Sequence, residues 1–192
     1  MELFPLDTIR KRLDDEFLPL EPTLTGFRLI ESPVSPDVVL QCARRLDVAF
    51  PSSFADAASH FDFGRFTIGP VAFCNTGDYF AWLVKVNENT SSHAHPWWGE
   101  AQRPHDLIMI ANSDPYAILL NVNTGQVLAL LHGDVWAKGA FVVARDFDVF
   151  FRGLATVLLQ RRPGGENEGL ARKVAAAVGV EPENAFWLEV GR

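Results

Sequence analysis

Cysteine is scarce in this chain, which has 192 residues and two cysteines, Cys42 and Cys74. The two form no Cys-x-x-Cys pattern, and a chain of this length can bury a sizeable core without disulfide staples. Cys42 falls on an apolar helical stripe, and Cys74 ends an apolar run. We therefore expect two reduced, buried thiols.

Long apolar runs are also missing. No segment approaches the roughly 18 consecutive apolar residues that indicate a membrane-spanning helix. The opening segment MELFPLDTIRKRLDDEF has neither the basic n-region nor the apolar h-region of a secretory signal peptide. These features predict a cytoplasmic protein that does not enter a membrane.

Basic residues are outnumbered, with 17 Lys and Arg against 24 Asp and Glu and a formal net charge of -7. Proteins that bind nucleic acid directly draw much of their affinity from cationic contacts to phosphates, so the acidic balance argues against that role. The same balance fits simple solubility, or recognition of a basic protein partner through complementary charge.

Catalytic motifs are few. The chain contains no Gly-x-Ser-x-Gly, Gly-x-Gly-x-x-Gly or His-Glu-x-x-His pattern. GRFTIG at 64–69 spaces its glycines as a phosphate-binding loop does, but the Lys-Ser/Thr that should follow is missing. We predict a non-enzymatic protein without a cofactor.

Apolar spacing predicts helices first and strands afterwards. Helical periodicity is found at 6–17, 35–46, 51–61 and 146–158, with Ser35 and Asp146 placed as N-caps. Short apolar runs predict strands at GFRLIESP, RFTI, VAFC, YFAWLVKV, DLIMIA and AFVVA. This order favours an α+β fold, with a mostly antiparallel sheet flanked by helices in a single domain.

The clearest local signal is a hairpin in AILLNVNTGQVLALL. Two apolar runs flank Asn-Thr-Gly, where Gly125 can adopt a positive φ without steric cost. Beyond residue 160, RRPGGENEG predicts a linker, followed by an Ala-rich helix and a possible strand at AFWLEV. We divide the chain into a domain at 1–160 and an appendage at 161–192 that either docks on the domain or serves as an arm.

Three segments between residues 36 and 160 resemble the SUKH superfamily. They are LDVAFPSSF, then DLIMIANSDPYAILLNVNTGQVLAL with Asn121, Thr124, Gly125 and Val127 at the signature positions, and finally VARDFDVFFRGL. The superfamily unites a fungal regulator of cell-wall synthesis with many bacterial immunity proteins. The resemblance implies a binding module that neutralises a co-encoded toxin, often a nuclease. It carries over no catalytic residue, because these motifs are structural.

One decapeptide, SSHAHPWWGE at 91–100, suggests chemistry of its own. His93, His95 and Glu100 follow the His-x-His-x4-Glu spacing of cupin-like metal sites, and His132 is a possible fourth ligand. Such a site suits Fe, Mn, Ni or Zn and is typical of a metal-dependent enzyme. Against it, Pro96 would break the ladder of a barrel strand, and a polar segment with Pro and Gly more often forms a plain loop.

The same segment offers binding residues. An exposed Trp97 and Trp98 would be strong anchors for a partner, whereas a buried pair would plug the core. Nearby acidic residues, Asp78, Glu88, Glu100 and Asp106, either meet a basic toxin surface or form a solvated face. The leading hypothesis is an immunity protein. The alternatives are the metal-dependent enzyme and an intracellular scaffold or regulator without a toxin partner.

Overall fold

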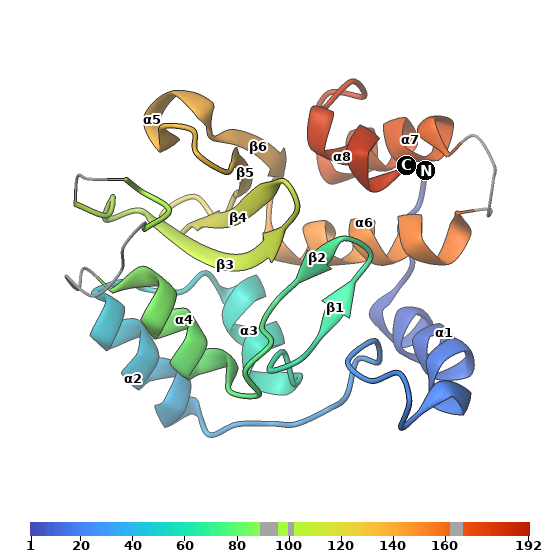
Figure 1. Ribbon diagram of the computed structural model, residues 1–192, viewed down its shortest axis with the longest axis horizontal. Helices are drawn as coiled ribbons and strands as arrows, with labels where there is room; N and C mark the ends of the chain where they lie inside the picture. Colours follow the sequence, from blue (N-terminus) through green and yellow to red (C-terminus); the bar gives the residue numbers. More distant parts are fainter. Residues whose placement is uncertain (89–95, 100–101, 162–166) are drawn as a thin grey trace.

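The structure is a computed structural model that describes residues 1–88, 96–99, 102–161 and 167–192 (Figure 1). The helices are α1 (Leu6–Phe17), the short 3-10 helix η1 (Leu18–Leu20), α2 (Pro36–Leu46), α3 (Ser52–His60), α4 (Tyr79–Asn87), α5 (Trp136–Gly139), α6 (Phe147–Gln160), α7 (Glu168–Val178) and α8 (Ala185–Val190). The strands are β1 (Thr67–Ile68), β2 (Val71–Ala72), β3 (Leu107–Ser113), β4 (Tyr116–Asn121), β5 (Val127–Leu131) and β6 (Phe141–Ala144).

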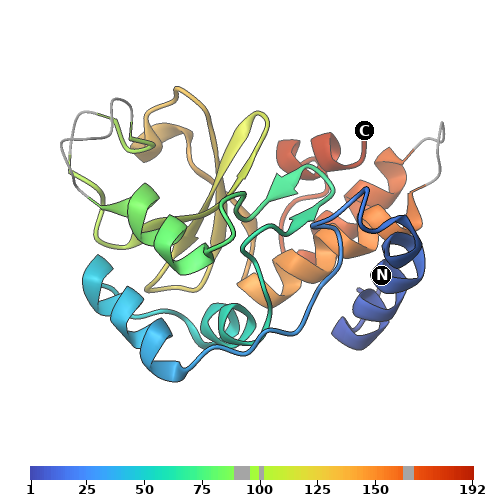
Figure 2. The same cartoon turned by 60° about the horizontal axis from the view of Figure 1, so that its bottom comes forward.

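The strands form one antiparallel sheet in the order β1-β2-β3-β4-β5-β6, so each strand pairs with its neighbours along the chain. Figures 1 and 2 show α2 and α4 beside one end of this sheet and α1 beside α6, farther along. The predicted α+β class, with an antiparallel sheet and flanking helices, is confirmed.

The β4–β5 hairpin is built as its sequence predicts. The side-chain Oδ1 of Asn121 accepts hydrogen bonds from the backbone N–H groups of Asn123 and Thr124, both at 3.0 Å. Gly125 takes a φ of 79°, in the left-handed region, and its N–H donates to the Asn121 carbonyl at 2.8 Å. The turn is therefore closed by an Asn side chain and a Gly backbone, for which these two residue types are favoured.

The central strands are apolar on both faces, and each face has its own core. One face joins the helices in the main core and carries Ile108, Ile110, Ile118, Leu120, Val127 and Ala129. The other face forms a smaller cluster with Leu107, Met109, Ala117, Leu119, Leu128 and Leu130. Trp97 and Trp136 pack on this second face. Burial on both faces explains why these strands lack polar alternation.

Two predicted strands are helices. YFAWLVKV forms most of α4, where Asp78 Oδ1 accepts from the Ala81 N–H at 3.0 Å as an N-cap. AFWLEV forms α8. Both runs are short and rich in aromatic and β-branched residues, so their composition favours a strand while packing selects a helix.

The strand predicted at GFRLIESP is also absent from the described structure, where this segment forms one isolated bridge, between Glu31 and Phe61. Its backbone makes separate hydrogen bonds instead, such as Asp62 N–H to the Ile30 carbonyl at 2.9 Å and Thr67 N–H to the Gly26 carbonyl at 2.7 Å. Gly26 has a φ of 87°, which interrupts an extended strand at its start.

The described part of the C-terminal region packs on the rest of the chain. Helices α7 and α8 lie against α6 and β6, and Val174, Val178 and Trp187 belong to the main core. The Trp187 indole N–H donates to the Val143 carbonyl at 2.7 Å, and the Asn184 amide donates to the Val142 carbonyl at 3.0 Å. These contacts cover the outer edge of β6, which would otherwise present unpaired backbone groups.

Candidate functional site

The candidate site is described from helix α4, because two of the acidic residues that the sequence suggests as partner contacts flank its ends. Asp78 is its N-cap and is exposed, while Glu88 is its C-cap and forms an ion pair with Arg45 of α2. The nine residues between them rise roughly 14 Å along the helix axis. Asp78 and Glu88 therefore belong to two different surface regions.

The last residue of α4, Asn87, is buried and is bonded through both amide atoms. Its Nδ2 donates to the carbonyls of Leu83 and Met109, both at 2.8 Å. Its Oδ1 accepts from the Met109 N–H at 2.7 Å and from the Trp97 indole N–H at 3.1 Å. Asn87 thus pairs with both backbone groups of Met109, as a neighbouring strand would do.

That pairing matters because the edge of β3 is only partly covered by a strand. Within the described residues, β2 pairs with Asn112 and Ser113, so the 107–110 part of the same edge has no strand partner. The Tyr79 hydroxyl donates to the Ile110 carbonyl at 2.9 Å, and burial raises the pKa of Tyr79 well above its ordinary value. Side chains from α4 therefore satisfy backbone groups that would be costly to bury unpaired.

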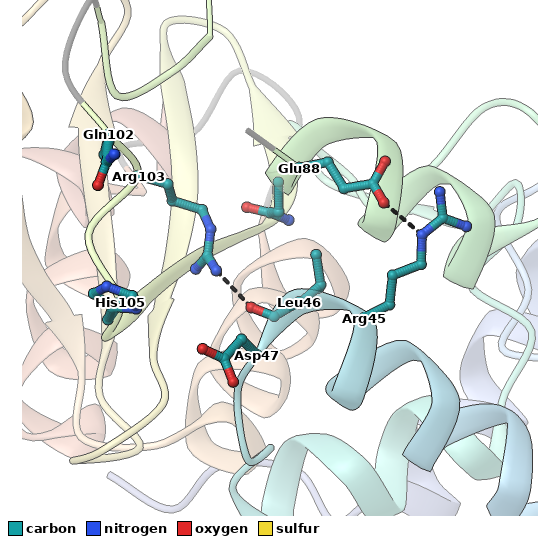
Figure 3. A pocket seen from close by; sticks show the side chains of 8 residues that line it. Arg45, Leu46, Asp47, Glu88, Gln102, Arg103 and His105 are labelled. Carbon is teal, nitrogen blue, oxygen red and sulfur yellow. Dashed lines mark hydrogen bonds and ion pairs between the residues drawn. The ribbon is translucent and has the colours of Figure 1, made fainter. Parts of the chain in front are cut away.

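Arg103 completes this edge. Its guanidinium donates to the Leu107 carbonyl at 2.8 Å and to the Leu46 carbonyl at 2.6 Å, tying the start of β3 to the end of α2 (Figure 3). Burial lowers the pKa of Arg103, and the Asp47 carboxylate opposes that shift. Arg103 therefore has a structural role, because its hydrogen bonds to backbone carbonyls hold the start of β3 against the end of α2.

A cleft of about 260 Å³ opens beside Arg103, between α2, the end of α4 and the segment before β3. An adjoining cleft of about 440 Å³ shares Asp47 and His105 and extends toward Asn123 of the hairpin. In Figure 3, Asp47 and His105 lie below Arg103. We call these two hollows together the α2–α4 cleft.

The mouth of the α2–α4 cleft is polar and open to solvent. Asp47, Gln102, His105 and Asn123 are exposed there. Asp47 ends α2 in the left-handed conformation, with a φ of 55°, which Asp tolerates better than most residues. These side chains can donate and accept hydrogen bonds at a partner's surface.

Trp97 and Trp98 point inward. Trp98 is 6% exposed, and Trp97 is half-buried over the second face of the sheet. Their rings meet edge to face with centroids 5.4 Å apart. The described arrangement therefore corresponds to the core-plug interpretation, in which Trp97 packs on the apolar cluster of the second face and the buried Trp98 packs against Trp97.

The remaining acidic residue that the structure describes, Asp106, is half-buried and accepts a hydrogen bond from the Asn121 amide at 3.2 Å. It helps to anchor the hairpin beside the α2–α4 cleft. Glu88 lines the α2–α4 cleft, whereas Asp78 lies at the other end of α4.

The suggested metal ligands His93, His95 and Glu100 lie outside the described residues. His132, the suggested fourth ligand, is exposed, and its Nε2 lies 3.1 Å from the Ser113 carbonyl at the far end of β3. In the part of the chain that the structure describes, no three His, Cys, Asp or Glu side chains are grouped as a metal site.

Sequence reasoning missed Asn87, Arg103 and Asp47. Asn87 directly followed the predicted strand YFAWLVKV, and Arg103 lay in the polar segment between that strand and the predicted strand DLIMIA. Helical spacing of Tyr79, Leu83 and Asn87 is a signal by which the first could have been found. No pattern in the sequence marks Arg103, because its partners come from positions 46 and 107.

No protein-family model matches this chain, and no curated protein matches it at a significant level. Among the described helices, none is long and apolar enough to cross a membrane.

Proposed function

We propose that this chain is a non-enzymatic binding protein of the SUKH type that acts in the cytoplasm as an immunity protein. It neutralises a co-encoded toxin by occluding the toxin's functional surface. The observation that carries the proposal is that the polar side chains around the α2–α4 cleft have two different roles: the buried ones bond to the backbone, and those at its mouth are exposed to solvent. Asn87 and Arg103 are bound to backbone groups of the sheet edge, so recognition falls to the exposed groups at the mouth.

The fold and the charge support the same proposal. The resemblance to the SUKH superfamily supports the proposal, and in the structure Asn121, Thr124 and Gly125 form a hairpin turn while α6 is mostly buried. A net charge of -7 favours association with a basic partner, because complementary fields raise the rate of encounter and disfavour wrong partners.

The test uses the protein encoded by the gene next to that of this chain. That protein is induced in bacteria with and without this chain, and survival is measured as colony-forming units. We expect survival only with this chain present, and a stoichiometric complex on size-exclusion chromatography of the purified pair. An unrelated toxin serves as the specificity control and should remain lethal.

A complex without protection would favour the scaffold alternative instead. The immunity proposal is wrong if this chain gives no protection, whether or not the pair forms a complex.

A further inference from the structure

A second hollow lies at the opposite end of α4, away from the α2–α4 cleft. Its volume is about 370 Å³, near the lower end of the range for ligand pockets. Its apolar walls come from α2 and the segment before it, from the end of α3 and the residue after it, and from the start of α4; they include Val34, Val38, Ala58, Phe61 and Phe80. We call it the α4 N-terminal groove.

The groove is accessible from solvent. Val38 on α2 is 40% exposed although it is apolar, and Phe80 is half-buried. Part of the apolar wall of the groove is therefore open to a ligand.

Two carboxylates are the charged groups that line the groove, Asp62 and Asp78. Both side chains are exposed, and among the described residues neither takes part in an ion pair. Arg65 lies close by, with its Nε 3.6 Å from the place where a Cβ on Gly77 would stand, but it does not line the groove.

Each carboxylate is held in place through one oxygen. Asp62 Oδ1 accepts from the Gly64 N–H at 2.7 Å, and Asp78 Oδ1 accepts from the Ala81 N–H at 3.0 Å. The two negative charges are therefore positioned by the backbone and do not depend on a long, mobile side chain. A cation that enters the groove meets them at a low cost in side-chain ordering.

Apolar walls with carboxylates fit a side chain that has an apolar stem and a cationic head. Arginine fits better than lysine, because its planar guanidinium can stack on the aromatic rings of Phe61 or Phe80 and still bond to carboxylates. We propose that the α4 N-terminal groove binds an arginine side chain of a basic protein partner. This inference rests on the proposed binding function and assigns Asp78 its role in that function.

The test is an NMR titration of the ¹⁵N-labelled full chain with N-acetyl-arginine amide at low ionic strength. We expect saturable shifts of backbone amides at 61–63 and 77–80. N-acetyl-citrulline amide has nearly the same shape without the charge, and it should give no saturable shift at these amides.

Asp62→Asn and Asp78→Asn remove the charges and keep the oxygen that accepts from the backbone, so both variants should fold. Each should weaken the apparent association of the arginine probe roughly two- to fivefold, and the double variant should abolish it. Asp15→Asn removes a charge of the same kind from exposed α1 and should change nothing. Equal shifts with citrulline, or unchanged binding in the double variant, would overturn the inference.

Failure of this inference and failure of the proposed function are distinguishable. If the unmodified chain protects cells and the double variant protects equally well, the groove is not the contact site but the immunity function stands. If the unmodified chain does not protect, the function is wrong, and the titration still judges the groove by itself.

Discussion

Replacement of Gly153 by alanine tests how the C-terminal helices are joined to the domain. Gly153 lies in the middle of α6, where a Cβ would stand 2.7 Å from Cη2 of Trp187 and 2.9 Å from Cγ1 of Val178. Distances this short require a neighbour to move. Trp187 is fully buried and its indole N–H is bonded to the Val143 carbonyl, so its ring has little freedom to do so.

Two opposing contributions set the change in the free energy of unfolding. Alanine is more favourable than glycine inside a helix by about 1 kcal/mol. Overpacking of a well-filled core costs about 1–3 kcal/mol. Because Trp187 is fully buried and its indole N–H is bonded to the Val143 carbonyl, we expect the upper half of that cost. Gly153→Ala should then lower the free energy of unfolding by about 1–2 kcal/mol in total.

The assay is urea unfolding followed by far-UV circular dichroism. Gly169→Ala is the matched control, because a Cβ at that position of α7 would have no neighbour within 4 Å among the residues that the structure describes. This control should be stabilised by about 0.5–1 kcal/mol through helix propensity alone. If Gly153→Ala proves as stable as the unmodified chain or more so, α7 and α8 do not pack on α6 as described.

Further outcomes concern Asn87, Cys42 and the metal alternative. Asn87→Ala leaves buried backbone and indole groups unpaired and should cost about 2–4 kcal/mol in urea unfolding, whereas Asn123→Ala on the exposed hairpin should stay within about 0.5 kcal/mol. Burial raises the pKa of Cys42 to about 12, so the native thiol should resist iodoacetamide at pH 8 and react once the chain unfolds. If the Cys42 thiol of the native protein reacts with iodoacetamide at pH 8 as fast as it does in urea, the burial of Cys42 is contradicted. Since the unfolded thiol ionises near its ordinary pKa of 9.0, this raised pKa should lower stability as pH rises from about 9 toward about 12. For the metal alternative, elemental analysis of untagged protein should find no stoichiometric Fe, Mn, Ni or Zn; a metal that is lost in a His93→Ala, His95→Ala variant would restore the enzyme hypothesis.

The sequence was sufficient where short-range interactions decide the structure. Asn121 and Gly125 close the hairpin through bonds within five residues, and Asp146 caps α6 by accepting from the Val149 N–H at 2.9 Å. Both features can be predicted because the residues that make them are close in the chain. The buried thiols and the mostly antiparallel sheet were also predicted correctly, because the apolar pattern and the order of the elements can be read along the chain.

Prediction failed where distant packing overrides local composition. The segments of α4 and α8 are rich in strand-forming residues, yet they are helices. Their helical form places Asn87 and Tyr79 against β3 and Trp187 against β6, where these side chains satisfy backbone groups of the sheet. A propensity scale contains no term for a partner that lies many residues away.

The candidate site shows the same division. The acidic balance, the positions of the carboxylates along the chain and the presence of adjacent Trp residues could be established from the amino-acid sequence alone, because they do not depend on how the chain folds. The tertiary structure decided that Trp98 is buried, that Asp78 and Glu88 lie at opposite ends of a helix, and that Asp62 joins Asp78 in one groove. Charge can be read from a sequence, but a surface forms only when the folded chain brings residues from separate segments together.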